Sequence, residues 1–204
     1  LNKASGRFFL FFTLAMTGNF LLLLGIDMVT FYLGFSLMGL STAALIIEHN
    51  TTKNLQTSRL YLAWTIAGEL FLFTAIVLLS SHSENFRFDT LELTNVNTVV
   101  LLLAVIGFGI KIALPGLHFW MPATYSSLPI AAAAVVSGPM ISAGILGLIR
   151  FLAPGTYENI FIGETLVYAG FLSAFYASVI GLIQPNVKVA LAYSSMSKMG
   201  LLAA

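Results

Sequence analysis

The sequence predicts an all-α membrane protein with about seven transmembrane helices, one of them discontinuous around Lys111 and Pro115. Three observations predict this fold. The 204 residues are 58% hydrophobic and only 8% charged, whereas a soluble domain carries roughly 25% charged residues. The apolar residues gather in seven runs, most of them near the ~20 residues that a helix needs to cross a bilayer. One of these runs holds a lysine and, four residues later, a proline.

The seven runs are residues 8–26, 28–47, 58–80, 96–115, 129–152, 161–183 and 187–204. The first run is too long, and too closely followed by the second, to be a cleaved signal peptide. The chain begins at Leu1 and ends within an apolar run, so we expect it to be a piece of a longer membrane protein.

Lysine and arginine predict the orientation. We call the side of the membrane that holds residue 1 side A, and the opposite side B. If successive spans alternate in direction, five basic residues lie on side A and two on side B. Those on side A are Lys3, Arg7, Lys53, Arg59 and Lys188, and those on side B are Arg87 and Arg150. Positive residues are enriched in cytoplasmic loops. Side A is therefore predicted to be cytoplasmic.

Several kinds of function are excluded by composition. The absence of cysteine rules out disulfides and thiolate metal or iron–sulfur ligation by this chain. A net charge of +1 provides no basic face for nucleic acid. His49, His82 and His118 lie in separate loops, and no glycine-rich phosphate loop is present. We expect no catalytic residues, no metal and no cofactor.

Three ionisable residues fall well inside predicted spans: Glu69, Lys111 and Lys198. Each costs at least ~2.5–3.5 kcal/mol near the bilayer centre, and such residues usually face the protein interior and mark an ion or proton path. The alternatives are lysines that reach the headgroups, or structural ion pairs.

A helix break is predicted beside Lys111. Pro115 has no N–H to give to the Lys111 carbonyl, and Gly107 and Gly109 loosen the same stretch. Irregular backbone at membrane depth is tolerated only where protein buries it or where it lines a watery cavity. A simple proline kink is the alternative. Pro139 predicts a second kink, in the fifth run.

His118 and Trp120 follow the break and are expected at the side A interface. Trp120 is interpreted as an interfacial anchor. His118 could relay protons, because its unperturbed pKa lies near 6.5, or it could be a capping or interfacial histidine.

Four segments together resemble a known family. They are "IDMVTFYLGFSLMGLST", "GFGIKIALPGLHFWMP", "VVSGPMISAGILGLIRF" and "VKVALAYSSMSKMG". They resemble the antiporter-like membrane subunits of respiratory complex I, of hydrogenase-4 and formate hydrogenlyase-type complexes, and of Mrp cation/proton antiporters. The resemblance implies two inverted five-helix repeats. Residues 1–152 would form the first repeat and 153–204 the truncated start of the second, with the N-terminus entering from the cytoplasm.

The resemblance also implies residue roles. Lys111 matches the lysine that serves the family as a central proton carrier. Lys198 stands where the family usually has histidine, which keeps a titratable group there. Ser36 stands where the family carries a glutamate, and Ser142 where it carries a second lysine. We hypothesise that Glu69, the remaining acid predicted deep in the bilayer, pairs with Lys111 directly or through water.

The function predicted is that of a proton-translocating membrane subunit in a larger redox-driven or ion-coupled complex, of the NADH:quinone oxidoreductase or hydrogenase type. Other membrane and peripheral subunits, the bilayer and H⁺ or Na⁺ would be its partners. Redox chemistry would lie in other subunits. The expected location is a bacterial or archaeal inner membrane, or an organellar one. Two alternatives stay open: a cation/proton antiporter or ion-coupled uptake module, and a divergent structural subunit without transport.

Overall fold

The computed structural model describes residues 3–47, 52–80, 87–88, 97–152 and 160–204. Within these ranges the regular structure is helical, apart from one isolated bridge between Asp27 and Arg87. The helices are α1 (Lys3–Leu24), α2 (Met28–Ile46), α3 (Thr52–Ser80), α4 (Thr98–Lys111), α5 (Trp120–Ser127), α6 (Ile130–Val135), the π-helical turn η4 (Val136–Met140), α7 (Ile141–Phe151), α8 (Ile160–Leu182) and α9 (Val187–Ala203).

The all-α membrane fold is confirmed. In the described part of the chain, five helical segments are long and apolar enough to cross a membrane: α1 from Gly6, α2, α3, the continuous α6–η4–α7 segment, and α8 from Phe161. The other two predicted spans correspond to shorter helices. One is α4, with 14 residues, which ends at the predicted break, and the other is α9, with 17.

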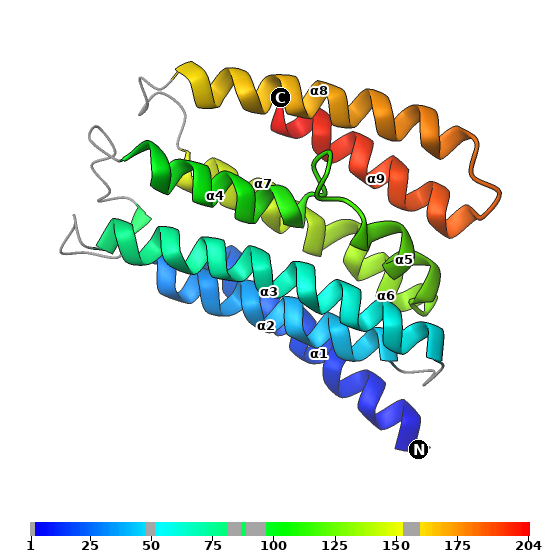
Figure 1. Ribbon diagram of the computed structural model, residues 1–204. Helices are drawn as coiled ribbons and strands as arrows, with labels where there is room; N and C mark the ends of the chain where they lie inside the picture. Colours follow the sequence, from blue (N-terminus) through cyan, green and yellow to red (C-terminus); the bar gives the residue numbers. More distant parts are fainter. Residues whose placement is uncertain (1–2, 48–51, 81–86, 89–96, 153–159) are drawn as a thin grey trace.

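The helices lie side by side with alternating direction (Figure 1). The N-terminal ends of α1 and α3 share one end of the bundle with α5 and α6, and this end is side A. Helices α1 to α3 form one flank and the α8–α9 pair the other, with α4 and α7 between them. A site built from α2, α3 and α4 therefore lies where the first flank meets the middle layer.

Glycines permit the closest helix crossings. A Cβ atom on Gly34 of α2 would lie 2.6 Å from the carbonyl oxygen of Gly18 in α1. A Cβ atom on Gly200 of α9 would likewise lie 2.6 Å from the carbonyl oxygen of Gly170 in α8. Small residues allow such close backbone approach in membrane helices.

The predicted discontinuity is present. Helix α4 ends at Lys111, and the chain stays irregular until Trp120. Ala113 adopts a left-handed conformation with φ of 59°, and the Leu114 N–H donates to the Gly109 carbonyl at 2.9 Å, which closes the helix end. Gly107 lies before the break within regular helix, where a Cβ atom would meet the Leu72 side chain of α3 at 2.6 Å.

Trp120 is not an interfacial anchor, contrary to the sequence interpretation. Its side chain is only 2% exposed, and its indole N–H donates to the Ile110 carbonyl at 2.9 Å. The physical reason is the break itself. The last turn of α4 leaves carbonyl groups without partners, and the indole satisfies one of them inside the protein.

Pro139 lies at an irregular turn, and the predicted kink there stays a prediction. It lies within η4, a five-residue π-helical turn between α6 and α7. Such turns are rare and occur frequently at functional sites. The Ser142 hydroxyl donates to the Gly138 carbonyl in this turn at 2.7 Å, and the Ser142 side chain is exposed.

Candidate functional site

The candidate site lies where α2, α3 and α4 meet. Glu69 comes from the middle of α3, and Lys111 is the last residue of α4. Gly39 of α2 lies between them: a Cβ atom there would be 2.9 Å from Glu69 Oε1 and 3.5 Å from Lys111 Nζ. The two charged atoms are therefore no farther apart than the sum of these distances, 6.4 Å.

Both charged groups are enclosed by protein. Glu69 is 8% exposed and Lys111 is 4% exposed. Among the described residues, neither Glu69 Oε1 nor Lys111 Nζ has a hydrogen-bond partner, and the ammonium lies 4.7 Å from the centre of the Phe35 ring. A polar pair separated by more than about 3.5 Å is one that a water molecule commonly bridges. The arrangement can hold one mobile proton between an amine and a carboxylate.

Ser36 contributes to the same site. It lies one turn before Gly39 on α2, is half-buried, and is a polar neighbour of the Glu69 carboxyl group. Its hydroxyl oxygen is buried and has no hydrogen-bond partner in the described part of the chain. Helix α3 thus delivers a carboxylate beside Ser36, the position at which the family resemblance leads us to expect one.

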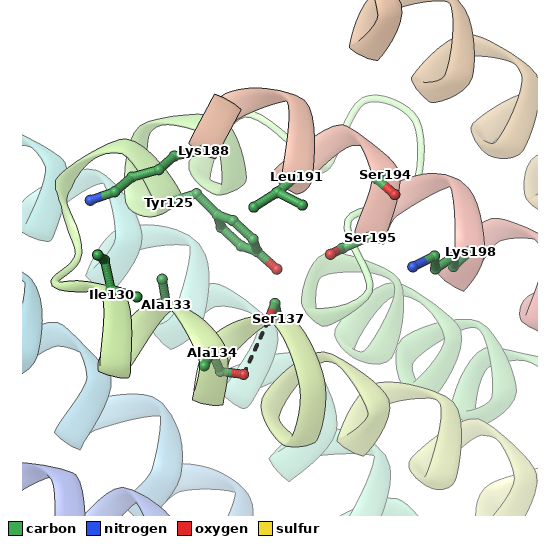
Figure 2. A pocket seen from close by; sticks show the side chains of 10 residues that line it. All are labelled: Tyr125, Ile130, Ala133, Ala134, Ser137, Lys188, Leu191, Ser194, Ser195 and Lys198. Carbon is green, nitrogen blue, oxygen red and sulfur yellow. Dashed lines mark hydrogen bonds between the residues drawn. The ribbon is translucent and has the colours of Figure 1, made fainter. Parts of the chain in front are cut away.

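Lys198 lies in a different setting. It lines one end of a cavity of about 370 Å³ between α9 and the α5–η4 segment, and Lys188 lines the other end (Figure 2). The hydroxyl of Tyr125, buried and without a partner among described residues, points into this cavity toward Ser195. Lys198 itself is exposed, and Lys188 Nζ donates to the Leu128 carbonyl at 2.8 Å.

His118 is buried within the protein. It is 7% exposed, stacks on Phe119 with ring centres 4.7 Å apart, and its Nε2 lies 3.5 Å from the Tyr176 hydroxyl of α8. The two cavities that Lys198 lines include neither His118 nor the Glu69–Lys111 pair in their walls. In the described ranges no group of three or more His, Asp or Glu residues could hold a metal ion.

A buried polar stripe on α3 was missed from the sequence. Between the start of α3 and Glu69, the buried face carries five polar side chains: Asn54, Thr57, Ser58, Tyr61 and Thr65. Their spacing of three and four residues places them on one helix face. The spacing is visible in the sequence. It was not used because only ionisable residues were considered as candidates for the site.

Comparison with known proteins decides the family. Residues 25–204 match the family model described as NADH:quinone oxidoreductase/Mrp antiporter, transmembrane. The chain belongs to this family. It is 31% identical over 206 residues to NADH-quinone oxidoreductase subunit N of Paraburkholderia phymatum, covering 96% of this chain and 42% of the relative. It is 29% identical to hydrogenase-4 component B of Escherichia coli K12, covering 82% of this chain and 26% of that relative.

Solved structures show the same fold. The membrane-bound sulfane sulfur reductase, an archaeal respiratory membrane complex, contains a chain that matches with a TM-score of 0.85 at 22% identity over 95% of this chain and 41% of its own length. Respiratory complex I from Thermus thermophilus matches with a TM-score of 0.82 at 22% identity, over 97% of this chain and 44% of its own. The chain therefore spans less than half the length of these relatives.

Proposed function

We propose that this chain translocates protons as a membrane subunit of a multisubunit complex, with Lys111 as the proton carrier and Glu69 as its charge partner. One observation carries the proposal: the Lys111 ammonium and a Glu69 carboxylate oxygen, both buried and without a hydrogen-bond partner among the described residues, lie within 6.4 Å of each other beside Gly39. An unpaired buried charge costs far more than a paired one. A site that keeps two such groups slightly apart is suited to protonation changes rather than to structural support.

Family membership supports the wider context. The relatives named above are subunits of NADH-quinone oxidoreductase and of hydrogenase-4. We propose that this chain likewise works with membrane and peripheral partner subunits that perform redox chemistry. Residues 1–152 would then form the first five-helix repeat and 153–204 the start of the second. Side A, with its five basic residues, would face the cytoplasm.

A cation/proton antiporter is the second candidate. The matched family model includes Mrp antiporters by description. Here a Na⁺ ion would need several oxygen ligands, as hard cations do, and the site offers the Glu69 carboxyl group with the Ser36 hydroxyl beside it. An ammonium in the same site opposes a bound cation by Coulomb repulsion, so the geometry favours protons.

Glu69→Gln tests the proposal. The full-length protein, assembled with its complex in proteoliposomes, is energised, and proton uptake is followed with a pH-sensitive dye. Proton transport is expected to fall by at least about tenfold, because positioned proton-transfer groups contribute at least that much. Glu164→Gln is the matched control, because Glu164 is exposed on α8. Unchanged proton transport in Glu69→Gln would overturn the role of this pair.

A further inference from the structure

Phe35 of α2 presents the face of its ring to the Lys111 ammonium. The ammonium lies over the ring, 4.7 Å from its centre, and the two side chains are only 2% and 4% exposed. A cation within about 6 Å of a ring centre is attracted by the negative face of the π system, and more strongly where water is excluded. The ring is therefore a partner for an ammonium that has no hydrogen bond among the described residues.

Aromatic neighbours hold this ring in place. Phe31, one turn earlier on α2, stacks on Phe35 with ring centres 6.2 Å apart. Phe108 of α4 meets the Phe35 ring edge-on, with ring centres 6.0 Å apart. A Cβ atom on Gly147 of α7 would collide with the Phe108 ring, so glycine at that position makes room for it. Three helices thus fix the face that Phe35 offers to the lysine.

Few charged or titratable groups face this ammonium from the helices packed around it. Helix α3 brings Glu69, whose Oε1 lies no more than 6.4 Å from Lys111 Nζ, and, two turns earlier, the buried Tyr61 phenol. Helix α7 packs on Lys111 through Gly144 and carries Arg150 six residues farther along. Helix α2 brings neither a carboxylate nor an amine. Of these groups, the ionised Glu69 carboxylate is the acceptor for the lysine proton.

A ring and a carboxylate stabilise an ammonium in different ways. A carboxylate attracts the ammonium and can also accept its proton, which leaves a neutral amine and a carboxylic acid. The face of a phenylalanine ring attracts the ammonium but does not take the proton. A lysine over Phe35 can therefore stay charged while it is apart from Glu69. An aliphatic side chain at position 35 would not allow this, because a buried charge without a partner is costly.

We propose that Phe35 is a positioning residue of the proton carrier, whose ring face holds the protonated Lys111 amine apart from Glu69 between proton transfers. The inference rests on the proposed function and deepens it, because it names the group that stabilises the charged carrier when the carboxylate does not. Weakening the π face without changing the shape of the ring must then make the lysine lose its proton at a lower pH.

Fluorine on the ring of Phe35 both weakens this contact and reports it. Fluorine atoms withdraw electrons from the negative face of a ring and change its size little, so the packing is kept. The full-length protein is prepared in lipid nanodiscs with a phenylalanine at position 35 that carries one fluorine atom or three. The fluorine NMR signal is then followed as the pH is changed. A singly fluorinated ring at Phe108, which is equally buried and lies one ring farther from the ammonium, is the matched control.

The fluorine signal at position 35 is expected to titrate together with the lysine. Lys111→Met should abolish this titration, because it removes the charge and keeps a side chain of similar length. The midpoint of the titration should lie about half a pH unit lower with three fluorine atoms than with one, which is about a threefold loss of proton affinity. The signal at Phe108 should change much less with pH.

Three results would overturn the role of Phe35. They are a signal at position 35 that does not titrate, a titration that persists in Lys111→Met, and a midpoint that fluorination leaves unchanged. A higher midpoint with three fluorine atoms would contradict it as well, since the released ammonium would then pair more closely with Glu69. The readout requires no transport, so these outcomes are separate from a failure of Lys111 to carry protons.

Discussion

Arg150 and Lys111 are two cations at the ends of apolar helices, and the structure treats them in opposite ways. Arg150, in the last turn of α7, donates to three carbonyl groups at the end of α1: Leu22 at 3.0 Å, Gly25 at 2.8 Å and Leu23 at 2.8 Å. Its guanidinium also lies 5.6 Å from the ring centres of Phe31 and Phe88. Lys111 is more deeply buried, and its ammonium has no hydrogen-bond partner among the described residues.

The contrast separates a structural charge from a functional one. A guanidinium is always charged and fits several acceptors at once, and a cation at a helix C-terminus is favoured by the helix dipole. Arg150 therefore stabilises the contact between the end of α1 and the last turn of α7. A lysine can lose its proton when buried, and a buried ammonium without partners weakens the fold. Under the proposed function, proton transfer rather than stability accounts for the lysine at position 111.

Lys111→Ala is the substitution with the largest expected effect on transport. Proton uptake by the assembled complex should fall by at least about tenfold, because the proton-carrying group is gone. Transport is compared per assembled complex, since the substitution leaves Glu69 buried without its counter-ion, which weakens the fold. Lys198→Ala, at a lysine that is exposed and lines open cavities, should have the smaller effect on transport. The reverse order would contradict the assignment.

Arg150→Gln should give the opposite result. A hydrogen bond to a charged group contributes about 1.5–3 kcal/mol. A glutamine at position 150 could keep only some of the three hydrogen bonds that Arg150 makes. We therefore expect the free energy of unfolding of the purified full-length protein to fall by about 2 kcal/mol, while transport per folded molecule is kept. A variant that folded normally but lost transport would place Arg150 in the proton path instead.

Gly39→Ala should disturb the pair without removing either charge. The added methyl group would lie 2.9 Å from Glu69 Oε1 and from Thr65 Cγ2. Overpacking at such a site typically costs about 1–3 kcal/mol, and relief by moving the carboxyl group away from Lys111 should lower transport. Gly163→Ala is the control, because nothing lies within 4 Å of its added Cβ atom. Equal transport in both variants would show that the separation of the pair is unimportant.

The sequence predicted the break and the buried lysine but not their surroundings. Both residues are conspicuous in the sequence, because Pro115 lacks the N–H that a helix needs and Lys111 places a charge in an apolar span. The pairing with Glu69 remained a hypothesis, because hydropathy does not determine how α3 rotates about its axis. Trp120 was misjudged for a related reason: an indole near a predicted helix end is usually interfacial, and only the folded backbone reveals that it satisfies the Ile110 carbonyl. Serine and threonine hydroxyls weigh little in hydropathy, so the polar stripe stayed hidden.

Asp27→Ala should have the smallest effect on the free energy of unfolding. Asp27 follows the turn at Gly25, whose carbonyl group accepts from Arg150. The Asp27 side chain caps α2 by accepting from the Thr30 N–H at 2.7 Å, and this hydrogen bond lowers the pKa of Asp27 below its ordinary value of 3.8. Loss of such a cap costs about 1 kcal/mol of unfolding free energy. The contribution of the ionised cap is present above pH 3.8 and is lost as pH falls through the lowered pKa. Asp27→Asn should retain the cap without this acid dependence in thermal unfolding, and equal acid sensitivity in both proteins would contradict the assignment.

Moving the carboxylate between helices tests the central claim most directly. Ser36 and Glu69 present their side chains to the same site from α2 and α3, so the acid should serve Lys111 from either position. The measurement is proton uptake by proteoliposomes holding the full complex with Glu69→Gln alone and with Glu69→Gln plus Ser36→Glu. We expect the single variant to lose proton transport and the double variant to regain a substantial part of it. Failure of the second substitution to restore any transport, in a protein that assembles normally, would contradict the idea that Glu69 replaces the missing acid beside Lys111.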